Sequence, residues 1–175
     1  PHPLHGGTMN NRIVLALYHM FQSRGFSVLR FNFRGVGRSQ GTFSRGEGEL
    51  SDAATALDWL QSYNDGASQC WIAGFSFGAW IGMQLLMRRP EIAGFISICP
   101  PANTHDFTFL APCPSSGLML SGEKDDIVPP DSVGTLVEKL RQQRGTDIGH
   151  VTVPGANHFF SGQLEELDRE VSVYL

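Results

Sequence analysis

The chain has 175 residues, of which 41% are hydrophobic, and it carries a formal net charge of -4 with an isoelectric point near 5.8. This amount of apolar material is enough for the core of one domain, so we expect a single domain over residues 1–175. The net negative charge and the scattered arginines argue against nucleic acids and anionic membranes as partners, because both are bound by clustered Lys and Arg.

The cysteine content and the hydropathy pattern indicate the cellular compartment and whether the chain crosses a membrane. The three cysteines, Cys70, Cys99 and Cys113, are an odd number, and the sequence opens without a signal-like segment. These features predict a cytoplasmic protein with reduced thiols, in which Cys70 and Cys99 are buried as small hydrophobic side chains. No apolar run approaches the roughly 18 residues that a transmembrane helix needs.

Apolar residues recur along the chain with two alternating periods, which predicts a parallel sheet covered by helices on both faces. From Val14 to Phe21 their spacing is that of one helical face, so we expect a helix over residues 10–24. Residues 26–33 follow as a predicted strand.

The same alternation continues to the end of the chain. It predicts helices around residues 50–60, 79–87, 133–140 and 164–174, and strands over residues 70–73, 94–98, 117–122 and 150–153. Asp131 and Ser161 precede the last two helices, and their side chains are suited to capping them.

The segment Gly74-Phe75-Ser76-Phe77-Gly78 joins a strand-like run to a helix-like run. In this position a Gly-x-Ser-x-Gly pattern is typical of a nucleophile elbow, a tight turn that exposes a serine hydroxyl. The serine of such a turn has a strained backbone, and the glycines are expected to let the strand and the helix pass without Cβ clashes. Ser76 is therefore a candidate nucleophile, with an ordinary turn serine as the alternative.

A nucleophilic serine needs an acid and a base, and both follow in the order that this motif predicts. A polar loop with Asp125 and Asp126 comes after the third of the predicted strands from residue 70 onward, and a loop with His158 comes after the fourth. The order of nucleophile, acid and base predicts a triad of Ser76, one of the two aspartates and His158.

With these motifs the chain resembles the α/β-hydrolase family across nearly its whole length. Residues 1–9 and 30–39 are similar to a compact bacterial branch, the dienelactone-hydrolase-like esterases. The resemblance implies a mostly parallel central sheet with helices on both faces and a serine hydrolase that requires no metal or organic cofactor. It also implies that Asp125 is the triad acid, because Gly-Asp-x-Asp-x-Val/Ile-Val-Pro loops of the family place the carboxylate there.

The resemblance further implies where the oxyanion hole lies. One backbone N–H donor is expected at Phe77, at the start of the helix after the nucleophile, and the other at His2, in the family's His-Gly-x turn. Gly6 and Gly7 are alternatives for the second donor, whereas the prolines on both sides of His2 have no N–H to donate.

Two absences complete the expected architecture. Residues 99–117 are rich in proline, lack helical periodicity and are too short for the separate lid domain that relatives insert in this region. The resemblance also implies that Pro1 comes just after a central strand. N-terminal strands are therefore expected to be missing from the sequence, which leaves a gap between the predicted strands at 26–33 and 70–73.

The leading functional hypothesis is hydrolysis of a small-molecule ester or related acyl substrate through an acyl-enzyme, with His158 as the base. An acyltransferase, a thioesterase or a peptidase would use the same triad. A protein of the same fold that only binds a ligand or a partner is the rival from another class. His158 as a helix cap, and His2, His5 and His158 as metal ligands, are further alternatives.

Overall fold

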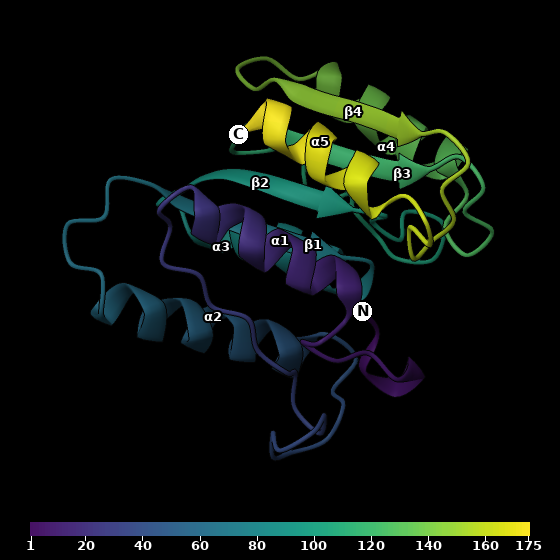
Figure 1. Cartoon of the computed structure of the whole chain (residues 1–175). Helices are drawn as coiled ribbons and strands as arrows, with labels where there is room; N and C mark the ends of the chain where they lie inside the picture. Colours follow the sequence, from purple (N-terminus) through teal and green to yellow (C-terminus); the bar gives the residue numbers. More distant parts are fainter.

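A computed structural model describes all residues from Pro1 to Leu175, and its centre is a parallel sheet of four strands in the order β1-β2-β3-β4 (Figure 1). The strands are β1 (Cys70–Phe75), β2 (Ile92–Ile98), β3 (Gly117–Gly122) and β4 (Ile148–Val153). Strand β3 is buried along its whole length, as expected of a parallel strand that is covered on both faces. The four strands predicted from residue 70 onward are confirmed.

Helices cover both faces of this sheet (Figure 1). They are α1 (Arg12–Ser23), α2 (Glu47–Ser62), α3 (Phe77–Arg88), α4 (Pro130–Arg141) and α5 (Leu164–Tyr174), and a short 3₁₀ helix, η1 (Pro3–His5), lies near the amino end. Helices α1 and α5 pack on one face, α3 and α4 on the other, and α2 packs against α3. The chain therefore has the layered α/β architecture that the resemblance predicts. None of its helices is long and apolar enough to cross a membrane.

The sheet separates two hydrophobic cores. Successive side chains of a strand point to opposite faces, so Phe95 lies in the core beneath α3 and α4, whereas Ile96 lies in the core beneath α1 and α5. Residues 99–116 form turns and bends without a helix, and Phe107 and Leu110 anchor them to the first core. The predicted absence of a lid domain is thus confirmed.

The two predicted N-caps are wrong. Helix α4 begins at Pro130, whose fixed φ suits the first helical position, so Asp131 lies inside the first turn. Helix α5 begins after Gln163, because Gly162, with a φ of 83°, still turns the chain beyond Ser161.

The predicted strand over residues 26–33 is also wrong, because this segment forms no β-ladder and β1 pairs only with β2. A cavity of ≈ 920 Å³, lined by residues such as Phe31 and Ala73, lies between this segment and the free edge of β1. Only Phe75 is buried in β1. A strand needs a hydrogen-bonded neighbour, and residues 26–33 have none on the other side of the cavity.

Candidate active site

Ser76 occupies the turn between β1 and α3, with φ 53° and ψ -119°. Such a conformation costs a residue with a side chain roughly 1–3 kcal/mol, so surrounding contacts must hold it. The Ser76 N–H donates to the carbonyl oxygen of Ile98 (2.8 Å), and the Ser76 carbonyl accepts from the N–H groups of Ala79 and Trp80 (2.9 and 3.2 Å). The turn is fixed by these bonds, while Ser76 itself is only half-buried.

The two glycines of the motif have different roles. A Cβ atom on Gly74 would lie 2.5 Å from the carbonyl oxygen of Gly78 and 2.7 Å from the Cα of Ala79. A Cβ atom on Gly78 would meet nothing within 4 Å. The close approach predicted for both glycines is confirmed at Gly74 and wrong at Gly78, because the latter's Cβ direction points into open space.

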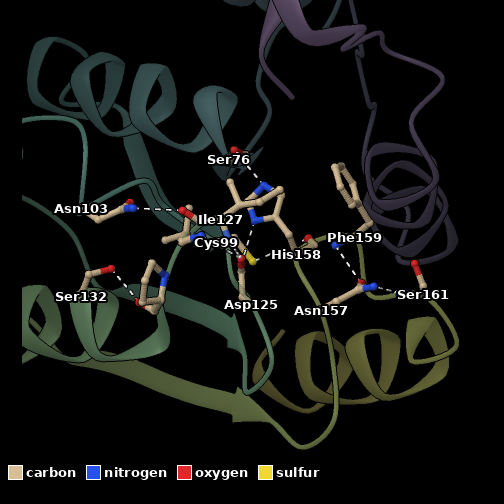
Figure 2. Close-up of polar contacts among 12 residues, drawn as sticks. Ser76, Cys99, Asn103, Asp125, Ile127, Ser132, Asn157, His158, Phe159 and Ser161 are labelled. Carbon is tan, nitrogen blue, oxygen red and sulfur yellow. Dashed lines mark hydrogen bonds and ion pairs between the residues drawn. The ribbon is translucent and has the colours of Figure 1, made fainter.

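The structure brings Ser76, His158 and Asp125 together in one line of contacts (Figure 2). Nε2 of His158 lies 3.1 Å from Oγ of Ser76, and Nδ1 of His158 lies 2.7 Å from Oδ2 of Asp125. Asp126, the alternative acid, is exposed on the same loop as Asp125. Of the two aspartates, Asp125 is therefore the one in contact with the histidine.

The loop after β3 holds the Asp125 carboxylate as an anion. Its Oδ1 accepts hydrogen bonds from the N–H groups of Ile127 (3.0 Å) and Val128 (2.8 Å). Burial acts to raise the pKa of Asp125, but the hydrogen bonds from His158 and Val128 outweigh it and hold this pKa below its usual range. An ionised Asp125 can orient the imidazole and stabilise its protonated form.

The loop after β4 fixes His158. Oδ1 of Asn157 accepts from the N–H groups of Phe159 and Ser161, both at 3.1 Å, and the fully buried Phe160 anchors the loop in the core. Both ring nitrogens of His158 contact other side chains, those of Ser76 and Asp125, so the alternative role of His158 as a helix cap is wrong.

The predicted oxyanion donors lie on the opening loop and at the start of α3. The N–H of Met9 donates to Oδ1 of Asn32 (2.8 Å), which fastens the opening loop, and the rings of His2 and Phe77 are 4.9 Å apart. The His2 N–H has no acceptor in the chain, and the Phe77 N–H, as the first of α3, has none within its helix. The Gly7 N–H donates to the His2 carbonyl (3.1 Å), which removes Gly7 as an alternative.

His2, His5 and His158 do not form a metal-binding group. His2 and His5 stack with their ring centroids 4.4 Å apart, but the one group of three potential ligand atoms in the chain consists of Cys99, Asp125 and His158. This alternative is therefore wrong.

Sequence reasoning missed that Cys99 borders the triad. Cys99 directly follows β2, just as Ser76 directly follows β1, and the carboxyl ends of parallel strands meet at one edge of a sheet. That position after a strand was the available signal. The prediction that Cys99 is buried is confirmed, whereas Cys70 is only half-buried.

Known proteins are similar to this chain over most or all of its length. Residues 3–117 match the family described as serine aminopeptidase, S33. An uncharacterized protein of Rickettsia prowazekii is 51% identical over 100% of this chain and 75% of its own length.

Two solved structures are similar over 99% of this chain. One is a protein of unknown function from Agrobacterium tumefaciens, with 63% identity, a TM-score of 0.97 and 80% of its own chain covered. The other is a serine hydrolase from Xanthomonas campestris, described as lacking a lid, with 34% identity, a TM-score of 0.89 and 76% of its own chain covered.

The unequal roles of the glycines can be tested by a matched pair of substitutions. Gly74→Ala should destabilise the protein by roughly 1–3 kcal/mol, because its methyl group meets backbone atoms that cannot move aside. Gly78→Ala should leave stability unchanged or slightly raised, because alanine favours the helix in which Gly78 lies. Thermal unfolding followed by circular dichroism measures both, and equal midpoints for the two variants would contradict this assignment.

Proposed function

Because the chain belongs to the α/β-hydrolase superfamily, in the family described as serine aminopeptidase, S33, we propose that it is a serine hydrolase of small esters or related acyl substrates. The observation that carries the proposal is the placement of one imidazole between the Ser76 hydroxyl (3.1 Å) and the Asp125 carboxylate (2.7 Å). In this arrangement Nδ1–H donates to Asp125, and the lone pair of Nε2 faces Ser76.

The first half of the reaction forms an acyl-enzyme. Nε2 of His158 takes the hydroxyl proton as Oγ of Ser76 bonds to the acyl carbon, and the carbonyl electron pair moves onto oxygen. Asp125 stabilises the imidazolium that results. When the carbonyl re-forms, the bond to the leaving group breaks, and His158 returns its proton to that group.

The second half uses water. His158 removes a proton from the water molecule that attacks the acyl carbon, and it then protonates Oγ of Ser76 as the carboxylic acid departs. In both halves the negative charge on the carbonyl oxygen is stabilised by the N–H groups of Phe77 and His2. Each such donor is worth roughly 3–4 kcal/mol in a preorganised site.

The surroundings of the triad favour a small acyl substrate. Three exposed apolar side chains lie on the loops that carry the site: Leu4 (64% exposed), Ile127 (51%) and Phe159 (49%). Residues 99–116 contribute no lid above them. An open apolar rim of this kind can hold a short acyl chain but offers no enclosed tunnel for a long one.

The proposal is tested first at the nucleophile. Ser76→Ala should lower kcat for p-nitrophenyl acetate by at least roughly a thousandfold, because it removes the hydroxyl that contacts Nε2 of His158. Ser51→Ala, at an exposed serine of α2, is the matched control and should turn over like the wild type. Undiminished turnover by Ser76→Ala would rule out this mechanism.

The two neighbouring acids give a second test. Asp125→Asn should reduce kcat roughly a hundredfold to ten-thousandfold with little change in KM, because an amide no longer holds the imidazole tautomer. Asp126→Asn removes the same charge from the same loop and should stay near wild-type activity. Steady-state kinetics on both variants distinguishes the two aspartates. A larger loss of kcat in Asp126→Asn than in Asp125→Asn would assign the acid to Asp126.

Substrate size gives a third test. A series of p-nitrophenyl esters should show the highest kcat/KM for acetate or butyrate and a decline toward dodecanoate, because the open rim cannot enclose a long chain. Lipid droplets should not activate the protein, since no lid has to open. Highest kcat/KM on dodecanoate would contradict the proposed substrate class.

A further inference from the structure

Cys99 follows β2 in a backbone conformation that side chains rarely adopt. Its φ is 46°, and its N–H donates to the carbonyl oxygen of Leu120 (2.8 Å). The residue is fully buried. Strained backbone persists only where the surrounding structure imposes it. In this conformation the Cys99 sulfur lies beside Asp125, as Figure 2 shows.

The Asp125 carboxylate has room for one more hydrogen bond. Its side chain is wholly buried, and an ionised carboxylate offers about four lone-pair sites. Ile127 and Val128 fill two sites on Oδ1, and His158 fills one on Oδ2. Oδ2 can therefore accept one more hydrogen bond, and a further donor stabilises a buried carboxylate.

The Cys99 thiol is placed to be that donor. Its sulfur, a carboxylate oxygen of Asp125 and a ring nitrogen of His158 all lie within 4.8 Å of one another. Burial and the charge of Asp125 raise the pKa of the thiol well above its usual value, so its hydrogen is retained. In the structure the thiol makes a long hydrogen bond, 3.9 Å, to the carbonyl oxygen of His158. A carboxylate attracts the weak S–H donor more strongly than this neutral carbonyl does.

We propose, on the basis of the catalytic role given above to Asp125, that Cys99 is a positioning residue whose S–H group donates to Oδ2 of Asp125. It shares this oxygen with Nδ1–H of His158. The thiol thereby limits how much of the carboxylate's negative charge acts on the imidazole, and it fixes the plane in which the carboxylate lies.

Besides His158, the thiol is the titratable side chain that acts on the Asp125 carboxylate. From the end of β1 the pair is faced by the neutral hydroxyl of Ser76 and from the end of β2 by Cys99. The other charged side chains of the loop after β3, Glu123, Lys124 and Asp126, are exposed. Loss of the thiol donor leaves more negative charge on Oδ2, which favours protonated His158, so the acid limb of the kcat/KM profile moves to higher pH.

Two substitutions of Cys99 and one control test this role. Cys99→Ala should lower kcat roughly three- to tenfold with KM unchanged, and it should move the acid limb to higher pH. Cys99→Ser keeps a hydrogen-bond donor and should restore both. Cys113→Ala removes a buried thiol from the core beneath α3 and α4, away from the triad, and should change neither.

A spectroscopic readout separates positioning from turnover. The proton NMR resonance of His158 Nδ1–H should move further downfield in Cys99→Ala and return in Cys99→Ser, because Oδ2 becomes a stronger acceptor once it is not shared. This resonance requires no catalysis. If it responds while the wild type hydrolyses no ester, the proposed function fails and the positioning role stands.

Unchanged resonance and pH profile in Cys99→Ala, or the same shift in Cys99→Ala and Cys99→Ser, overturns the proposal. If Cys99→Ala does not fold, the infrared S–H stretching band of Cys99, assigned by its loss in Cys99→Ser, decides. We expect this band at lower frequency in the wild type than in Asp125→Asn, where the acceptor is neutral. Equal frequencies in the two proteins also overturn the proposal.

Discussion

The last backbone hydrogen bonds of the sheet hold the site together. Each residue that follows a strand donates to the neighbouring strand: Ser76 to Ile98 (2.8 Å), Cys99 to Leu120 (2.8 Å) and Glu123 to Val153 (3.0 Å). Because β1 to β4 are parallel, these bonds bring the loops that follow all four strands to one edge. Ser76, Cys99, Asp125 and His158 come from four separate segments, and this shared edge brings them close together.

Burial along this edge is graded, and the gradient suits acyl transfer. Asp125 and His158 are buried, whereas Ser76 is half-buried and open to a substrate. The proposed acid therefore lies where water does not weaken its electrostatic interactions, and the proposed nucleophile lies where a substrate can reach it. The strained turn at Ser76 has two effects, because it exposes the hydroxyl and also begins α3. The first N–H groups of α3 can stabilise an oxyanion.

Features that depend on local sequence pattern could be predicted. Apolar periodicity was sufficient for the five long helices and the four strands of the sheet, and the order of the motifs brought Ser76, Asp125 and His158 to attention. Features that depend on distant neighbours were missed. Residues 26–33 have a strand pattern but no partner, and the space beside Gly78 exists only once the chain has folded. The place of Cys99 directly after a strand was visible in the sequence, but its distance from Asp125 was not.

The central claim is that the fold makes Ser76 a nucleophile, and labelling with a fluorophosphonate followed by peptide mass spectrometry tests it most directly. Such a reagent forms a stable phosphonyl ester with an activated serine. We expect one adduct per chain, located on Ser76, and no adduct after the protein has been unfolded in denaturant, because a serine without its histidine is a poor nucleophile. A folded protein that takes up no label, or takes it up on another serine, would contradict the account.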